Sequence, residues 1–223
     1  MGTTRRILIT AGPTHEPIDA VRFIGNRSSG RLGVALADEA SARGAAVTLL
    51  LGPVHVRPSD PRVTVRSFTT CEDLRALLAE EAPRSDVVIM AAAVADYRPK
   101  RDTVLAGGKF RRTEGPLTLE LESTPDLIAE VSARRAEGQV LVAFALEPAA
   151  EVVSSAKQKL VRKGVDLVVG NPLETMDSSQ IEAVVVDRGG NEARSGLMSK
   201  VQFAGWVLDR IEEITASPRR GEP

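Results

Sequence analysis

The chain has 223 residues, one cysteine and a formal net charge of −1. This length suits a single domain with a sizeable core, and the near-zero charge excludes a general attraction to nucleic acid or to a membrane surface. One cysteine excludes an internal disulfide and a cysteine-rich metal site.

The first half of the chain alternates strands and helices. Residues 5–12 are a β-branched run that ends at glycine and proline, which predicts a buried strand. A long loop is expected over residues 12–30, and the apolar spacing predicts a helix over residues 30–44 that ends at a glycine. The elements expected next are strands at 45–52 and 63–68, a helix at 69–85 opened by a capping threonine, and a buried strand at 86–95.

This alternation is typical of a parallel sheet with right-handed crossovers, that is, a doubly wound α/β fold. Ligands of such sheets bind beyond the carboxyl ends of the strands. The loops after the first and fourth strands, residues 12–30 and 95–100, are therefore the expected ligand site.

The second half begins with an arm and then resumes the alternation. Residues 109–124 alternate around a Gly-Pro pair, which predicts an extended or hairpin arm that protrudes from the sheet. The later elements expected are helices at 124–138, 149–164 and 200–214, strands at 139–148 and 165–172, and a hairpin at 181–196. We therefore expect one domain over residues 1–215 and a flexible tail over 216–223.

Residues 22–34, RFIGNRSSGRLGV, almost match a nucleotide-binding phosphate loop. From Gly25 the stretch reads G-x-x-x-x-G-R rather than G-x-x-x-x-G-K, and the Ser or Thr that would hold magnesium is missing. Arginine does not replace the compact charge of that lysine, so the match is poor. The N–H groups of Ser28, Ser29 and Gly30, just before a helix, form either an anion site or an ordinary helix start.

Two other classes of site find little support. The turn after the first strand lacks G-x-G-x-x-G, and the second strand ends without an acidic residue for a ribose hydroxyl, which argues against a dehydrogenase. The two histidines, His15 and His55, lie near neither a nucleophile elbow nor an H-E-x-x-H helix, so no metal centre is expected.

Charged side chains gather at three further places. Asp96 directly follows an apolar strand, where it is either a structural cap or part of the ligand edge of the sheet. Lys109 opens a basic K-F-R-R run, and Lys159 and Lys163 share one face of a helix near its end; each cluster also fits a solvated surface. Together, basic clusters in a near-neutral chain indicate a polyanionic small ligand such as a nucleoside triphosphate.

Six segments carry a family resemblance, and they read ITAGPTHEPIDAVRFIGNRSSGRLG, AAAVADYRP, KFRR, TPDLIAEV, VAFALE and AKQKLVRKGVDLVVGN. In their order they resemble the phosphopantothenoylcysteine synthetases of coenzyme A biosynthesis, over nearly the whole chain. The resemblance implies a Rossmann-like, mostly parallel sheet and a homodimer in which the protruding arm is used. It also implies that the near phosphate loop is an intact acyl-cytidylate loop.

The resemblance implies a two-step ligase reaction. The carboxylate of 4′-phosphopantothenate attacks the α-phosphate of CTP and forms an acyl-cytidylate and pyrophosphate; the amine of L-cysteine then forms the amide and releases CMP. Mg2+ is expected with the nucleotide, and no flavin is expected because the decarboxylase half of bifunctional relatives is absent. The chain is expected to work in the cytoplasm, either beside a separate decarboxylase or as part of a longer protein, and no leader or membrane span is expected.

Site residues follow from the matched motifs. Asn26 corresponds to the asparagine that handles the acyl-cytidylate, Arg22 to a contact of the substrate phosphate, and Lys109 to the first lysine of a mobile arm. The residues expected to contact the nucleotide or its phosphates are Ser28, Ser29, Gly30, Ala92, Asp96, Thr124, Pro125, Asp126, Leu127, Phe144, Lys159 and Lys163.

Departures from the family pattern leave alternatives open. The family's K-x-K-K segment reads K-x-R-R here, and Thr124 replaces the usual asparagine. A ligase that uses ATP, and a non-catalytic nucleotide-binding relative, therefore stand beside the CTP-dependent ligase.

Overall fold

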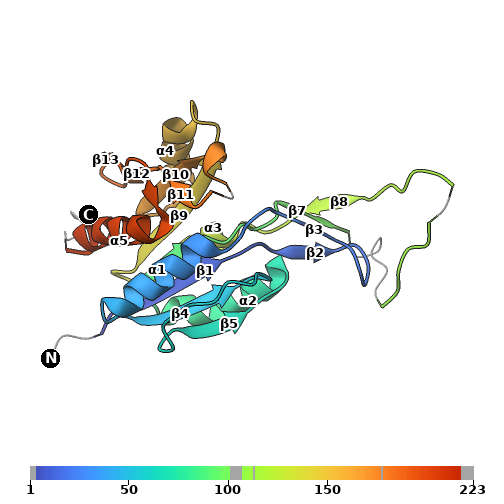
Figure 1. Cartoon of the computed structure of the whole chain (residues 1–223), viewed down its shortest axis with the longest axis horizontal. Coiled ribbons are helices and arrows are strands. Elements are labelled where there is room, and N and C mark those ends of the chain that lie inside the picture. The colour runs from blue at the N-terminus through green and yellow to red at the C-terminus, as the bar shows by residue number, and fades with distance from the viewer. Residues whose placement is uncertain (1–3, 101–106, 113, 177, 217–223) are drawn as a thin grey trace.

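The structure, a computed structural model, describes residues 4–100, 107–112, 114–176 and 178–216. An eight-stranded sheet crosses the domain in the spatial order β13-β12-β10-β9-β6-β1-β4-β5 (Figure 1). Its strands are β1 (Arg6–Ala11), β4 (Ala46–Leu51), β5 (Thr64–Ser67), β6 (Val87–Met90), β9 (Val140–Glu147), β10 (Leu167–Pro172), β12 (Val184–Asp187) and β13 (Glu192–Arg194).

The strands from β5 to β10 in this order are all parallel. Counted along the chain, their spatial order is 3-2-1-4-5-6, which is the order of a doubly wound dinucleotide-binding sheet. β12 and β13 extend the sheet beyond β10 as antiparallel strands. The predicted doubly wound, mostly parallel α/β fold is confirmed.

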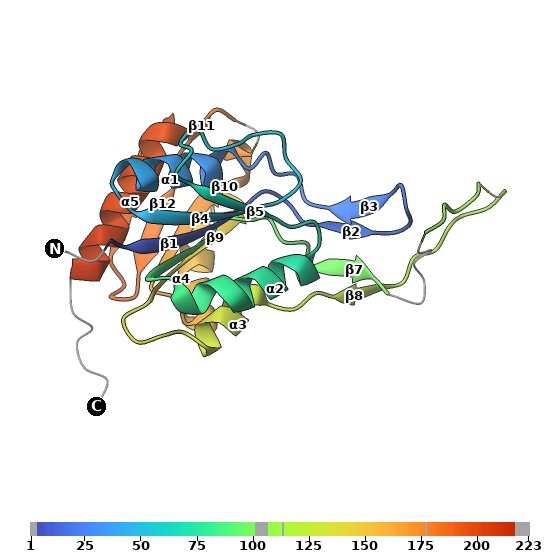
Figure 2. The same cartoon turned by 90° about the horizontal axis from the view of Figure 1, so that it is seen from below.

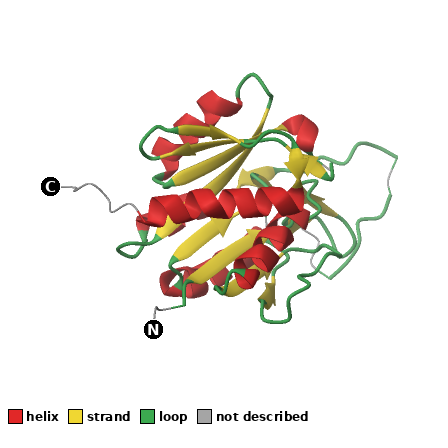
Figure 3. Cartoon of the chain, turned by 60° about the vertical axis from the view of Figure 1, so that its left-hand side comes forward, coloured by secondary structure: helices red, strands yellow, loops and turns green. Residues whose placement is uncertain are grey.

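Helices cover both faces of the sheet (Figure 3). Those described are α1 (Arg31–Ala42), α2 (Cys71–Glu81), α3 (Leu127–Ala133), α4 (Val152–Lys163) and α5 (Lys200–Ala216). α1 and α5 pack on one face, and α2, α3 and α4 pack on the other. Because both faces are covered, all four residues of β6 are buried and apolar instead of alternating.

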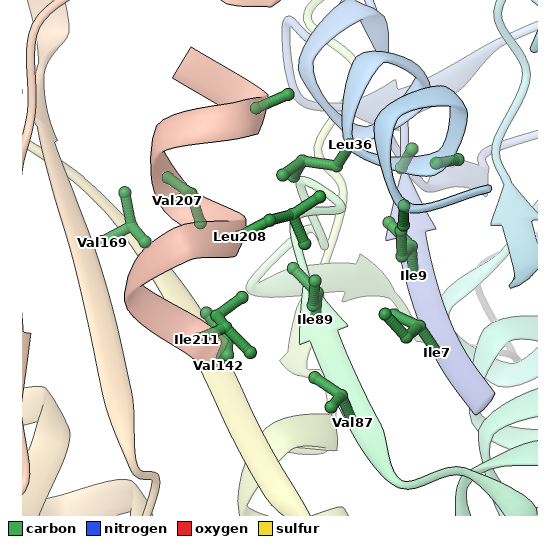
Figure 4. Packing of buried hydrophobic residues seen from close by; sticks show 14 of the residues in the cluster. Ile7, Ile9, Leu36, Val87, Ile89, Val142, Val169, Val207, Leu208 and Ile211 are labelled. Carbon is green, nitrogen blue, oxygen red and sulfur yellow. The ribbon is translucent and has the colours of Figure 1, made fainter. Parts of the chain in front are cut away.

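Neighbouring residues of β1 point into opposite cores. Ile7 and Ile9 pack in one core with Leu36 of α1 and Val207 of α5 (Figure 4). Leu8 packs in the other core, with side chains of α2, α3 and α4. The strand period of two thus divides one continuous apolar run between two layers of helices.

Two short antiparallel ribbons form an arm that projects from the sheet (Figures 1 and 2). One ribbon pairs β2 (His15–Pro17) with β3 (Phe23–Gly25), and the other pairs β7 (Tyr97–Pro99) with β8 (Leu121–Ser123). The first ribbon lies where the sequence predicted only a loop, because strands of three residues give no periodic signal. The arm predicted around the Gly-Pro pair is present, with β8 paired to the earlier strand β7.

Helix ends in the first half follow local capping. α2 begins at the predicted cap Thr70, whose side chain accepts a hydrogen bond from the Asp73 N–H while Asp73 bonds back to the Thr70 N–H. α2 stops at Glu81, earlier than predicted, because a 3-10 turn that contains Pro83 follows.

The second half keeps the predicted order with shorter elements. α3 begins after its cap Asp126 and ends well before the predicted glycine, whereas α4 ends as predicted at Gly164, whose φ is 61°. The predicted hairpin is the pair β12–β13, which turns at Gly190 with a φ of 81°. The minor elements are η1 (Ala82–Arg84), η3 (Leu173–Thr175), β11 (Gln180–Ile181) and β14 (Met198–Ser199).

The C-terminal helix α5 runs to Ala216, so the predicted tail beyond it lies outside the described residues. Within the described ranges, no helix is both long enough and apolar enough to cross a membrane.

Candidate functional site

The loops after β1 and β6 run side by side at the carboxyl edge of the sheet. The Ala93 N–H donates to the Gly12 carbonyl at 2.9 Å, and the Thr14 N–H donates to the Ala93 carbonyl at 3.2 Å. The strand order reverses between β1 and β6, and ligands of doubly wound sheets bind at this switch point. These are the two loops at which the sequence predicted a ligand.

Two buried threonines shape the loop after β6, and the sequence analysis missed both. The Thr10 hydroxyl accepts a hydrogen bond from the Ala92 N–H at 3.1 Å, and the Thr14 hydroxyl accepts one from the Ala95 N–H at 3.0 Å. Both threonines are completely buried. The sequence offered one signal for each: Thr10 lies in an apolar strand, and Thr14 follows just after it. A buried hydroxyl needs a hydrogen-bond partner, so both threonines could have been predicted to bond a neighbouring loop.

The Thr124–Leu127 segment lies against the same loop. The Thr124 hydroxyl donates to the Ala95 carbonyl at 2.6 Å, and its N–H donates to the Asp96 carbonyl at 3.0 Å. Two residues later, Asp126 caps α3 by accepting the Ala129 N–H at 3.3 Å. The structure thus places the Thr-Pro-Asp start of α3 against Asp96, in the loop that also contains Ala92.

The two lysines of α4 reach this edge from the side. Lys159 donates to the Phe144 carbonyl within β9, and Lys163 forms an ion pair with Asp126. Burial lowers the pKa of Lys159, although the negative charges of Glu147 and Asp96 oppose this shift. Burial also lowers the pKa of Lys163, again against the charge of Asp96. Partly desolvated amines next to an open strand edge are well suited to bind phosphate oxygens.

Asn26 and the start of α1 complete the edge on its other side. The Asn26 side-chain amide donates to the Val94 carbonyl at 2.9 Å, which ties the loop after β3 to the loop after β6. Gly30 precedes α1 with a φ of 70°, and a Cβ atom there would lie 3.0 Å from the Val54 side chain. Among the described residues, no side chain caps this helix start, so its first N–H groups lie uncapped beside Ser28 and Ser29.

Arg22 and Lys109 do not join this cluster within one chain. They lie on the arm, where the Arg22 guanidinium bonds the Asp19 carboxylate at 2.6 Å and the Phe110 carbonyl at 2.8 Å. Lys109 is exposed, and its neighbours Gly108 and Phe110 are bonded to the backbone of Ala20 and to Asp19. Two of the three predicted catalytic residues are therefore separated from the residues predicted to bind the nucleotide.

Asp19 organises the tip of the arm, although an acidic residue in a predicted loop gave no signal. Its side chain is fully buried and accepts hydrogen bonds from the N–H groups of Val21, Arg22 and Phe110. Burial alone would raise the pKa of Asp19, but these bonds and the Arg22 guanidinium hold it well below the usual range. The tip is thus built around an ionised carboxylate.

The described site residues were compared with the ligands that a bound metal ion needs. In the part of the chain that the structure describes, no three His, Cys, Asp or Glu side chains gather where they could hold a metal. Magnesium, however, is usually bound through one or two carboxylates together with the phosphates of a nucleotide. Asp96, near both lysines, is such a carboxylate, so the residues fit a magnesium ion that arrives with a nucleotide.

Known proteins resemble the chain over most of its length. The family model described as the DNA/pantothenate metabolism flavoprotein C-terminal domain matches residues 3–215. The coenzyme A biosynthesis bifunctional protein CoaBC of Vibrio cholerae is 40% identical over 214 residues, which cover 94% of this chain and 52% of that protein. A cysteine/cysteine sulfinic acid decarboxylase of an unknown prokaryotic organism is 38% identical over 211 residues, which cover 93% of this chain and 58% of that protein.

A solved structure agrees with these relatives. The crystal structure of the C-terminal domain of a coenzyme A biosynthesis bifunctional protein CoaBC has a TM-score of 0.81 and 33% identity, and the match covers 95% of this chain and 96% of that chain. The chain spans about half the length of the curated relatives it matches. The family indicated by the sequence motifs is therefore confirmed: the chain belongs to the DNA/pantothenate metabolism flavoprotein C-terminal domain family.

Proposed function

We propose that the chain is a phosphopantothenate–cysteine ligase that uses CTP and acts in coenzyme A biosynthesis. The observation that carries the proposal is the convergence of Asn26, Asp96, Lys159 and Lys163 on one edge of the sheet. This edge combines cations for phosphates, a carboxylate beside them and an amide donor. The names of relatives such as the bifunctional CoaBC proteins support the same pathway.

The first step needs alignment and charge stabilisation. The carboxylate of 4′-phosphopantothenate attacks the α-phosphorus of CTP, the bond to the β-phosphate oxygen breaks, and pyrophosphate leaves with an acyl-cytidylate formed. Lys159 and Lys163 hold the triphosphate, and Asp96 binds the ribose or the magnesium ion that enters with CTP. No protein nucleophile is required, because binding and electrostatics supply most of the acceleration in phosphoryl transfer.

The second step transfers the acyl group to L-cysteine. Its amine attacks the acyl carbon, an amide bond forms, CMP leaves, and the amine loses a proton. Negative charge grows on the acyl oxygen during this attack, and the Asn26 side-chain amide, which now donates to the Val94 carbonyl at this edge, would stabilise it. Asn26 therefore acts chiefly in the second step.

Pyrophosphate release by the purified chain, with 4′-phosphopantothenate and magnesium, tests the proposal. CTP is compared with ATP, and each reaction is run with and without L-cysteine. We expect release with CTP, and CMP and amide formation only when cysteine is present. Pyrophosphate release with ATP but not with CTP would show that the ligase uses ATP. Binding of CTP without pyrophosphate release in any mixture would show that the chain is a non-catalytic nucleotide-binding protein.

We further propose a homodimer in which the arm of one chain reaches the sheet edge of the other. Large exposed apolar side chains gather on the arm, among them Phe23 at 52% and Tyr97 at 55% exposure. The partner's arm would supply Arg22 and Lys109, which lie away from the nucleotide residues of their own chain. In the cell, we expect this dimer in the cytoplasm, where a flavin-dependent decarboxylase, separate or fused, would act on its amide product.

Phe23→Glu tests the arm. A charge on this exposed ring position opposes burial in a dimer, so we expect the mass measured by light scattering to halve and amide formation to fall at least tenfold. Val201→Glu, at an apolar side chain on α5 that is 69% exposed, is the control and should change neither quantity. A Phe23→Glu protein with unchanged mass would contradict the proposed dimer.

Thr14→Val tests the support of the Asp96 loop. Valine keeps the volume of threonine but leaves the buried Ala95 N–H without its acceptor, a loss of about 1–3 kcal/mol. We expect the KM for CTP to rise about tenfold with kcat within about twofold, and Thr14→Ser to restore the KM. An unchanged KM in steady-state kinetics of the valine variant would show that Thr14 does not position the loop.

A further inference from the structure

The two lysines of the site have different partners in the free chain. Lys159 donates to an uncharged group, the Phe144 carbonyl, whereas Lys163 forms an ion pair with Asp126. The lysines lie four residues apart on one face of α4, and burial lowers the pKa of both amines. Lys163 therefore already has a counter-charge at the place where nucleotide phosphates are expected.

The exposure of Asp126 suits an ion pair with Lys163 that can break. Its side chain is 44% exposed, whereas that of Lys163 is only 13% exposed. A carboxylate this exposed turns towards water at little cost, but an amine this buried needs a counter-charge in every state. The Asp126 carboxylate caps α3 through Oδ1 and faces Lys163 through Oδ2, so Lys163 can be released while the cap is kept. The backbone of the segment need not move either, since Thr124 holds it against Ala95.

We propose that Asp126 is a displaceable counter-ion for Lys163 and thereby a positioning residue that sets how tightly the site holds phosphates. The proposal rests on the proposed function. When CTP binds, its phosphates replace Oδ2 of Asp126 at Lys163, and repulsion between like charges moves this oxygen towards water while Oδ1 keeps the cap of α3. After the first step, Asp126 competes with pyrophosphate for Lys163 and speeds the release of this product.

Calorimetric binding of inorganic pyrophosphate, without CTP or cysteine, tests the proposal. Asp126→Asn keeps the side-chain size and the cap of α3, because asparagine and aspartate are equally good caps, but it removes the charge. We expect the variant to bind pyrophosphate about fivefold more tightly than the wild type, as the loss of a partly exposed ion pair predicts. In steady-state kinetics, product inhibition by pyrophosphate should strengthen by a similar factor.

A second variant separates this role from a structural one. In a Lys163→Gln background, Asp126→Asn should no longer change pyrophosphate binding, because the ammonium group for which Asp126 and pyrophosphate compete is absent. Pyrophosphate binding that is unchanged or weaker in Asp126→Asn overturns the proposal, as does a gain that persists without Lys163. The binding measurement needs no turnover. An absence of ligase activity in the wild type would therefore refute the proposed function, but the comparison of pyrophosphate binding could still be interpreted.

Discussion

Asn26→Asp is expected to uncouple the two steps of the reaction. The carboxylate removes the amide donor that now bonds the Val94 carbonyl, and it places a negative charge where the acyl oxygen becomes negative. Loss of one such donor costs about a hundredfold or more in rate. We expect amide formation to fall by at least this factor, while a first turnover of pyrophosphate is still released from CTP and 4′-phosphopantothenate.

Rapid-quench measurements of a single turnover separate these outcomes, because they follow pyrophosphate and the amide in the same sample. Asn26→Ala is the matched control: it removes the donor without adding a charge, so acyl-cytidylate should again accumulate, with a smaller loss in amide formation. If both variants lose pyrophosphate release as fully as amide formation, Asn26 acts in the first step, and the oxyanion role is refuted.

Asp166→Ala is expected to have the largest effect on stability. Asp166 is 3% exposed at the opposite edge of the sheet and binds the guanidinium groups of Arg135 and Arg188. It also accepts the Leu141 N–H at 2.9 Å. Removing one partner from a buried ion network leaves uncompensated charge and typically costs about 3–5 kcal/mol. We expect the free energy of unfolding to fall by this amount.

Urea unfolding followed by circular dichroism checks this value, with the slope of the transition showing whether unfolding stays two-state. Glu192→Gln is the control, because it breaks an ion pair with Lys157 on the surface and should change stability little. If the free energy of unfolding falls by a similar amount in both variants, the Asp166 network stabilises the fold no more than a surface ion pair does. Nucleotide affinity of the folded Asp166→Ala protein should be unchanged, since the site lies at the other edge.

Local patterns accounted for the sheet but not for the β2–β3 ribbon of the arm. Strands such as β1 and β9 are continuous apolar runs bounded by turn residues, and α2 carries its own cap at Thr70, so neighbours in sequence were enough to predict them. β2 and β3 are three residues long and read as loop. The turn that joins them is held by Asp19, which accepts hydrogen bonds from the N–H groups of Val21 and Arg22 and from the Arg22 guanidinium.

The site shows the same division. Asp96 was recognised because it follows a buried strand, and Lys159 and Lys163 because helical spacing places them on one face. Thr10 and Thr14 were missed, since only the packing of β1 beside β6 turns their hydroxyls into supports of the Asp96 loop. The ion pair between Lys163 and Asp126 joins residues 37 positions apart, and no local pattern predicts it.

The sequence by itself determined the fold class, the order of the main elements and the chemical character of the ligand edge, because these depend on periodicity, capping and charge within short windows. Only the tertiary structure decided which distant side chains meet. It placed the loop of Asp96 at the switch point between β1 and β6, and it placed Arg22 and Lys109 on the arm. Contacts of this kind come from strand order and loop docking, which are set by the packing of the whole chain.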